Sequence, residues 1–172
     1  MCLCRSRLRS RRLRQSRAAE SSGRIANVRE LSGAFNRMRA ASSNNPHFIN
    51  DQAEPFSIIS ISTTGDVSTF SPELLTSNHT RYGNFVFGNI YRDSFEAIAE
   101  SPKFASISAA IARGVANCAR TCGYFRVCQG GAPSNKIFEN GDFETTETIY
   151  CRVTQQAVLD IALELAETFA RG

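Results

Sequence analysis

Residues 118–152 read CARTCGYFRVCQGGAPSNKIFENGDFETTETIYCR and hold four of the six cysteines of this chain. Their spacing is Cys118-x3-Cys122-x5-Cys128-x22-Cys151. Side chains four residues apart on a helix lie on one face, about 5–6 Å apart at Cβ, which suits two ligands of one metal centre. The Asn140–Gly141 pair predicts a tight turn, which reverses the chain and returns Cys151 at the start of a last helix. We therefore predict that these four cysteines converge on one centre and that the chain folds around it.

The four thiolates leave the identity of this centre open. Four cysteines are the complete ligand set of a [4Fe–4S] or [2Fe–2S] cluster, and soft sulfur ligands also suit zinc. Structural zinc sites usually contain two closely spaced cysteine pairs, which the x5 gap and the distant Cys151 fit less well. Unligated cysteines in an apolar core are the third alternative. Cys2 and Cys4 lie far from this segment and are expected to be free.

Around the cysteine segment, hydrophobic periodicity and turn residues predict an α+β domain with a β-hairpin, several short helices and a closing C-terminal helix. Ser101 and Pro102 are typical of an N-cap and a first helical residue, and Gly114 is expected to end that helix. The expected elements are a helix over 24–41, a linker over 42–55, a hairpin of strands 56–62 and 67–70, a loop over 71–80, a short strand over 84–90, helices over 94–100 and 102–114, a small hairpin around 140–141 and a helix over 147–170.

The charge of the chain is concentrated at its N-terminus. Residues 1–17 carry seven arginines and no acidic residue, whereas the remainder carries 13 basic and 16 acidic side chains. This distribution predicts no nucleic-acid-binding face, and no apolar stretch approaches the roughly 20 residues that cross a membrane. The Arg-rich tail is expected to be disordered. An import signal is the alternative, although its leucines lie five residues apart and do not form a helical stripe. A cytoplasmic protein with reduced thiols is expected.

The stretch 118–152, preceded by YGNFVFGNIYRDSFEAIAESPKF over 82–104, resembles the SPASM-type auxiliary-cluster domain of radical SAM enzymes. It looks closest to the peptide maturases of glycine-rich-repeat (GRRM-type) systems, which are associated with cyclophane crosslinks in ribosomally made peptides (RiPPs). The resemblance covers roughly residue 24 to the C-terminus. It implies metal binding as iron–sulfur rather than zinc, with Cys118, Cys122, Cys128 and Cys151 as the ligands and no catalytic residue in this chain.

The chain departs from the two-cluster SPASM pattern in a selective way. The early cysteine pair has no counterpart, since the hairpin carries Ser68, Thr69 and Phe70 there. The pattern also has a cysteine separated from Cys128 by three intervening residues, and that position is Ala132. In the pattern that this stretch resembles, the missing positions are the ligands of the first auxiliary cluster. The four retained cysteines match the ligands of the second cluster. The resemblance therefore implies one [4Fe–4S] cluster.

The radical SAM core signature, C-x3-C-x2-C, is absent as well. Cys118-x3-Cys122 begins like it, but Phe125 occupies the third position. About 100 residues precede the auxiliary region, too few for a catalytic barrel of roughly 200 or more residues. The resemblance divides the chain into a tail over 1–23, a helix and linker over 24–55 that resemble the end of such a barrel, and a SPASM-like domain over 56–172. S-adenosylmethionine would then bind only through a missing or separate catalytic domain.

These features predict a truncated or split auxiliary domain of a peptide-modifying radical SAM maturase, inactive alone, whose fully ligated cluster relays electrons or organises the fold. In the family, reaction begins when a 5′-deoxyadenosyl radical abstracts a hydrogen atom from the substrate. The expected partners are a precursor peptide and a radical SAM catalytic partner in trans. The alternative is a zinc- or cluster-stapled module that binds a peptide at its hairpin edge.

Other residues near the cysteines have less specific interpretations. Gly130 and Gly131 either bring backbone amides to the cluster sulfurs or form an ordinary turn. Tyr124 and Phe125 are expected to pack as core residues. The charged residues expected to be solvated are Lys136, Glu139 and Glu147. His47 and His79 lie in loops without a metal-ligand partner at usable spacing.

Overall fold

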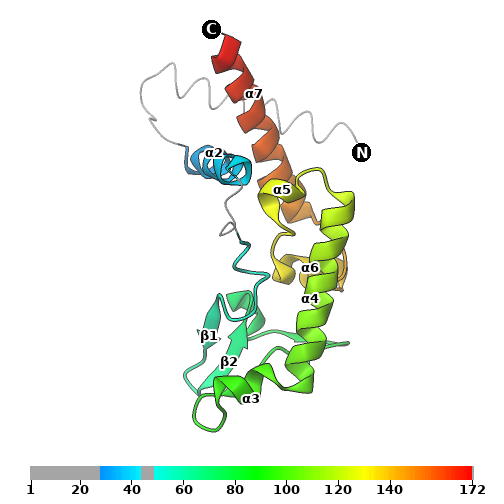
Figure 1. The fold of residues 1–172 in the computed structure, drawn as a ribbon. Helices are drawn as coiled ribbons and strands as arrows, with labels where there is room; N and C mark the ends of the chain where they lie inside the picture. The colour runs from blue at the N-terminus through cyan, green and yellow to red at the C-terminus, as the bar shows by residue number, and fades with distance from the viewer. Residues whose placement is uncertain (1–27, 44–48, 172) are drawn as a thin grey trace. The chain divides into compact units, whose positions relative to one another are not determined.

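The computed structural model describes residues 28–43 and 49–171, so the predicted tail and His47 lie outside the described residues. The chain forms two compact units, one of Pro46–Thr148 and one of Met1–Asn45 with Ile149–Gly172. The predicted α+β class, with a hairpin, several short helices and a C-terminal helix, is confirmed (Figure 1). The division at residues 24 and 56 concerns kinship with a larger enzyme and stays a prediction.

A small antiparallel sheet opens the larger unit. Strand β1 (Ile59–Ile61) pairs with β2 (Asp66–Thr69), and β2 pairs with β5 (Gly88–Asn89), in the order β1-β2-β5. The predicted hairpin is confirmed, although its first strand begins at Ile59. Phe56 has a φ of 60°, which is incompatible with a strand. Residues 71–80 were expected to be a loop but contain a 3-10 turn (Pro72–Leu74) and strand β3 (Asn78–His79), which pairs with β4 (Gly83–Asn84).

Two serines begin the next helices; the sequence offers Asp93 or Ser94 as the N-cap of the first and Ser101 as the N-cap of the second. Ser94 caps α3 (Phe95–Ala99) and Ser101 caps α4 (Pro102–Thr121), each accepting a backbone N–H at 3.2 Å. The predicted end of α4 at Gly114 is wrong. A Cβ at Gly114 would lie 2.0 Å from the carbonyl oxygen of Phe143, so this glycine permits close packing inside a continuous helix rather than ending it.

The predicted hairpin around residues 140–141 is also wrong. Two short helices, α5 (Phe125–Cys128) and α6 (Pro133–Asn140), occupy this region. Gly141 has a φ of 75° and donates its N–H to the carbonyl oxygen of Ile137 at 3.0 Å. The Asn–Gly pair therefore ends a helix, where a left-handed glycine is as common as it is in a hairpin turn.

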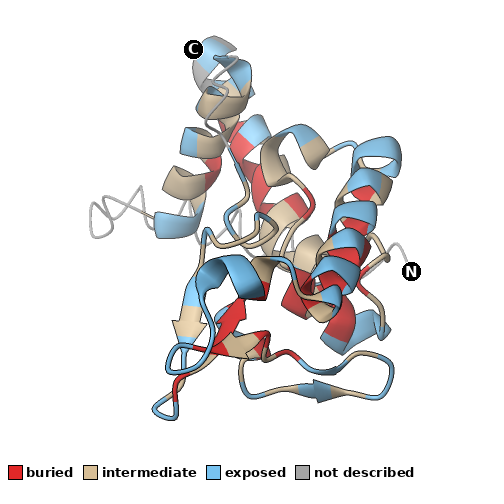
Figure 2. Cartoon of the chain, turned by 60° about the horizontal axis from the view of Figure 1, so that its bottom comes forward, coloured by how far each residue is buried: buried red, intermediate tan, exposed pale blue. Residues whose placement is uncertain are grey.

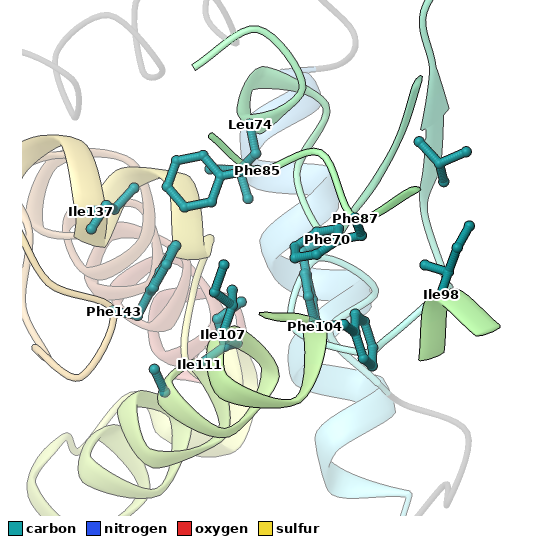
Figure 3. Packing of buried hydrophobic residues seen from close by; sticks show 12 residues of the cluster. Phe70, Leu74, Phe85, Phe87, Ile98, Phe104, Ile107, Ile111, Ile137 and Phe143 are labelled. Carbon is teal, nitrogen blue, oxygen red and sulfur yellow. The ribbon is translucent and has the colours of Figure 1, made fainter. Parts of the chain in front are cut away.

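An aromatic cluster forms the core of the larger unit. The ring of Phe104, on the buried side of α4, stacks on the rings of Phe56 and Phe70 at centroid distances of 5.0 and 6.1 Å. Figure 2 shows the alternation of buried and exposed sides along α4, and Figure 3 shows the cluster. Burial of each such side chain stabilises the fold by roughly 1.5–3 kcal/mol. The cluster comprises Val67, Phe70, Leu74, Phe85, Phe87, Ile98, Phe104, Ile107, Ala110, Ile111, Ile137 and Phe143.

The smaller unit is a pair of helices. Helix α2 (Arg29–Ser42) packs against α7 (Ala157–Arg171). The predicted helix over 24–41 is confirmed from residue 29, and residues 24–27 lie outside the described part. The predicted last helix begins near residue 149 and passes through a π-helical turn, η2 (Cys151–Gln156), before α7. The buried side chains of the smaller unit are Ala34, Gln156, Val158, Leu159, Ile161, Ala162 and Leu165.

Candidate metal centre

Cys118 lies in the last turn of α4 and is buried, with 6% of its surface exposed. Its Sγ lies 3.9 Å from the carbonyl oxygen of Gly130 and 3.8 Å from that of Thr146. Three segments of the larger unit therefore meet at this sulfur: the end of α4, the loop after α5 and the segment after α6.

Cys122 is the C-cap of α4, and Cys128 is the last residue of the short helix α5. The backbone N–H of Cys122 donates to the carbonyl oxygen of Cys118 at 2.9 Å, so these cysteines are one helical turn apart, as the spacing predicts. The N–H of Phe125 donates to the Cys122 carbonyl at 3.1 Å and starts α5, which ends at Cys128. Cys128 is therefore the last residue of a short helix. Both side chains are half-buried.

The loop after Cys128 has three successive residues with positive φ: 54° at Gln129, 98° at Gly130 and 68° at Gly131. A Cβ at Gly130 would lie 3.0 Å from a methyl group of Val115 on α4. The amide nitrogen of Asn50 donates to the carbonyl oxygens of Gln129 at 3.1 Å and Gly131 at 2.9 Å. The two glycines thus let the loop lie against α4 near Cys118, and Asn50 fixes its conformation.

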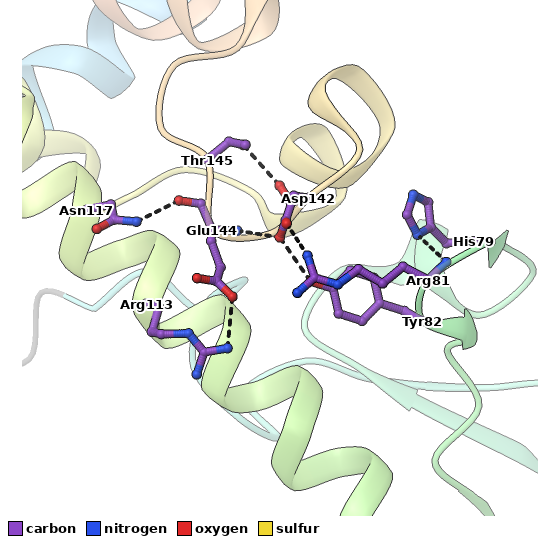
Figure 4. Close-up of polar contacts among 8 residues, drawn as sticks. All are labelled: His79, Arg81, Tyr82, Arg113, Asn117, Asp142, Glu144 and Thr145. Atoms are coloured by element: carbon purple, nitrogen blue, oxygen red, sulfur yellow. Dashed lines mark hydrogen bonds and ion pairs between the residues drawn. The ribbon is translucent and has the colours of Figure 1, made fainter.

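A polar network anchors the segment after α6 (Figure 4). The carboxylate of Asp142 accepts hydrogen bonds from the hydroxyl of Tyr82 at 2.9 Å and from the guanidinium of Arg81. Glu144 pairs with Arg113 of α4 at 2.9 Å, and its carbonyl oxygen accepts from the side-chain amide of Asn117 at 2.8 Å. These contacts hold the segment against α4, two residues before the Thr146 carbonyl that faces Cys118.

The network also shifts the pKa values of its members. Burial and the neighbouring Asp142 carboxylate raise the pKa of Tyr82 to about 12. Burial alone would raise the pKa of Asp142, but the hydrogen bonds from the Glu144 backbone and Tyr82, with the charge of Arg81, lower it below its ordinary value. The hydrogen bond from Arg113 lowers the pKa of Glu144. The segment is therefore held in part by two ionised carboxylates.

Cys151 belongs to the smaller unit, where it is the first residue of η2. The side-chain nitrogen of Gln156 donates to Cys151 Sγ at 3.5 Å. A π-helical turn brings residues five apart onto one face, and such turns occur frequently at functional sites. Gln156, which is 5% exposed, is therefore placed to contact the sulfur of a predicted ligand.

Lys136 was expected to be a solvated surface residue, and this prediction is wrong. It is 4% exposed, and its ammonium lies 2.9 Å from the carbonyl oxygen of Gly114 and 3.4 Å from Cys118 Sγ. Residues 133–140 form a helix, which places Lys136 on the same buried side as Pro133 and Ile137. A helical interpretation of this stretch could have found it. Glu139 and Glu147 are exposed, as predicted.

The predicted ligands do not form a metal site in the described part of the chain. Among the described residues, no three His, Cys, Asp or Glu side chains form a group that could hold a metal ion. Cys118, Cys122 and Cys128 belong to the larger unit and Cys151 to the smaller one, so their convergence stays a prediction. The chemistry of the donors fits a cluster, because four thiols are present and a buried ammonium contacts the sulfur of Cys118.

Comparison with known proteins gives one informative similarity. The chain is 45% identical over 117 residues to a protein of Synechocystis sp. named "Uncharacterized protein sll1766". The matched stretch covers 68% of this chain but 29% of that protein, which is therefore about 400 residues long. This chain thus spans less than a third of the length of its relative. No protein-family model and no solved structure matches the chain. Nor does the described part of the chain contain a helix with the length and apolar character needed to cross a membrane.

Proposed function

We propose that this chain is the iron–sulfur auxiliary part of a radical SAM/SPASM enzyme that modifies ribosomally made peptides. The observation that carries the proposal is the course of the backbone from Cys118 to Cys128. A helix ends at the first cysteine pair, a second short helix ends at the third cysteine, and a left-handed loop returns to Cys118. The ligands of the one [4Fe–4S] cluster would be Cys118, Cys122, Cys128 and Cys151.

A cluster with four cysteine ligands supplies electron relay or structural stabilisation. The residues that would hold it are Cys118 at the end of α4, Cys122 after it, Cys128 at the end of α5 and Cys151 at the start of η2, and Asn50 fixes the loop that follows Cys128. S-adenosylmethionine would bind to a catalytic barrel outside these residues. The Synechocystis protein supports this division, since most of its length lies outside the matched stretch and leaves room for a barrel of roughly 200 residues.

The partners of this part would be a precursor peptide and the catalytic barrel, in a cytoplasmic setting where thiols stay reduced. The edge of the sheet is a suitable place for the peptide. Among the described strands, β1 pairs with β2 alone, in the order β1-β2-β5, and Ile59 and Ile61 are 43% and 48% exposed. An extended peptide can add a strand to such an edge.

The same edge supports a second candidate function, a peptide-binding module stapled by zinc rather than by an iron–sulfur cluster. Zinc would require the same four thiolates. The two functions differ in inorganic sulfide, which an iron–sulfur cluster contains and a zinc site lacks.

Anaerobic purification of the full chain, with iron, zinc and sulfide analysis, tests the proposal. We expect a brown protein with about four irons and four sulfides per chain. Cys128→Ser and Cys151→Ser should each reduce the iron content strongly, because a serine oxygen is a poor ligand for the cluster. A Cys2→Ser/Cys4→Ser double variant is the matched control and should retain the iron.

Three results would count against the proposal. A folded, colourless wild-type protein without metal would exclude both functions, and zinc without sulfide would favour the peptide-binding module. Equal loss of iron in the double control variant would show that the assignment of the ligands is wrong.

A further inference from the structure

The ammonium of Lys136 is buried in the larger unit without a carboxylate. No described acidic side chain forms an ion pair with it, and its polar neighbours are the carbonyl oxygen of Gly114 and the sulfur of Cys118. A buried charge is costly unless an opposite charge and hydrogen bonds compensate it. A neutral thiol is only a weak acceptor, whereas a metal-bound thiolate carries the negative charge that this ammonium lacks.

The fold makes specific room for this contact. Gly114 and Cys118 lie one turn apart on the buried side of α4. A Cβ at Gly114 would lie 3.2 Å from the Lys136 nitrogen as well as 2.0 Å from the Phe143 carbonyl oxygen. The backbone of Phe143 therefore requires a glycine at this position, and the Lys136 nitrogen lies beside it. Lys136 is held by the packing of α6, on which it lies, and by its hydrogen bond to the Gly114 carbonyl oxygen of α4, the helix that carries Cys118.

The smaller unit repeats the arrangement with different residues. Gln156 is 5% exposed, and its amide nitrogen donates to Cys151 Sγ at 3.5 Å. Two of the four predicted ligands thus receive a nitrogen donor from a buried polar side chain, one in each unit. Buried side-chain donors aimed at sulfur are expected around iron–sulfur clusters, where they orient the ligands and stabilise charge on the sulfurs.

We propose that Lys136 and Gln156 are positioning residues that donate N–H···S hydrogen bonds to Cys118 and Cys151 and raise the reduction potential of the cluster. This inference rests on the proposed function. Reduction adds negative charge to a cluster, and hydrogen-bond donors and positive charges near its sulfurs stabilise the reduced form. Lys136 provides both a donor and a charge, so its effect exceeds that of Gln156.

The test is a redox titration of the full chain, purified anaerobically, with the absorption and electron paramagnetic resonance of the cluster as readouts. Lys136→Met removes the charge and the donors but keeps the length of the side chain. We expect its potential to be more negative than that of the wild type. Gln156→Leu should shift the potential in the same direction by less. Lys136→Arg, which retains a positive donor, should remain closer to the wild type than Lys136→Met.

Lys103→Met is the matched control. Lys103 lies on α4 and is half-buried, and like Lys136 it donates to a backbone carbonyl, that of Val86 at 2.7 Å, but its other acceptor is the side chain of Asn84 rather than a cysteine. Its removal should leave the potential unchanged. Circular dichroism of each variant establishes that the helices are retained, so that a change of potential is separated from a loss of fold.

Each outcome bears on one proposal. A wild-type chain without iron and sulfide overturns the proposed function. A wild-type cluster whose potential is the same in Lys136→Met, Gln156→Leu and the control overturns this inference alone. If Lys136→Met loses the cluster, retention in Lys136→Arg and in the control supports the inference, and loss in a folded Lys136→Arg chain contradicts it.

Discussion

Gly114 lies in the middle of α4, with the carbonyl oxygen of Phe143 and the ammonium of Lys136 on the side where a side chain would begin. A Cβ would lie 2.0 Å from that oxygen, which belongs to the backbone and cannot rotate away. The residue therefore serves two purposes: it lets the segment after α6 approach α4, and it leaves the path by which Lys136 reaches Cys118.

Gly114→Ala should destabilise the chain by about 2 kcal/mol. Overpacking in a core costs about 1–3 kcal/mol, and the gain in helix propensity offsets at most about 1 kcal/mol of it. Urea-induced unfolding of the full chain measures the change. Gly123→Ala is the control, because a Cβ there would meet nothing within 4 Å, and it should change stability by less than about 0.5 kcal/mol. Equal stability of the two variants would contradict the packing described for α4.

The sequence identifies the cysteines but not the residues around them. A cysteine pair at helical spacing can be recognised in the amino-acid sequence, and Cys118 and Cys122 are indeed one helical turn apart. A helical interpretation of residues 133–140 places Lys136 on the same side as Pro133 and Ile137. Its contact with α4 is not local, and lysine is ordinarily solvated. Asn50 contacts a loop about 80 residues further along the chain, and only the folded chain brings them together.

Between elements, the network of Arg81, Tyr82 and Asp142 links the β3–β4 hairpin to the segment after α6 (Figure 4). The pKa of Asp142 is lowered in the folded chain. Its contribution to stability is therefore complete above its ordinary pKa of 3.8 and is lost as the pH falls through the lower, folded value. The raised pKa of Tyr82, about 12, places the loss of its own contribution between pH 10 and that value.

Asp142→Asn should lower the free energy of unfolding by about 1 kcal/mol at pH 6, because a half-exposed ion pair and a hydrogen bond are lost. Its stability should also fall less than that of the wild type as the pH is lowered from 3.8 through the lower, folded pKa of Asp142. Thermal unfolding over this pH range measures both effects. Asp51→Asn, at an exposed carboxylate, is the control and should follow the wild type. Wild-type acid sensitivity in Asp142→Asn would show that this carboxylate is not stabilised by the network.

The starts of helices that a capping residue marks were predicted correctly. The positions where a glycine can either lie within a helix, end a helix or form a hairpin turn were not. Ser94 and Ser101 cap the helices that follow them because an N-cap is a local contact. The local sequence predicts a helix end at Gly114 and a hairpin turn at Gly141. The first lies within a helix because of tertiary packing, and the second ends a helix instead of turning a hairpin, since both uses require the same left-handed backbone.

For the whole molecule, the four predicted ligands are divided between the two units: the larger unit holds Cys118, Cys122 and Cys128, and the smaller unit holds Cys151. A metal centre whose ligands come from two units couples metal binding to folding. The pattern of cysteines predicts this coupling from sequence, because ligand number and type are fixed by chemistry. A sequence pattern does not describe the relative placement of the ligands.

Native mass spectrometry of the full chain, kept free of oxygen, tests the convergence of the four cysteines most directly. We predict one main species, heavier than the bare chain by one [4Fe–4S] cluster, and loss of that added mass in Cys151→Ser while Cys2→Ser keeps it. A wild-type chain at its bare mass, or a Cys151→Ser chain that keeps the whole cluster, would contradict the proposal that these thiolates share one centre.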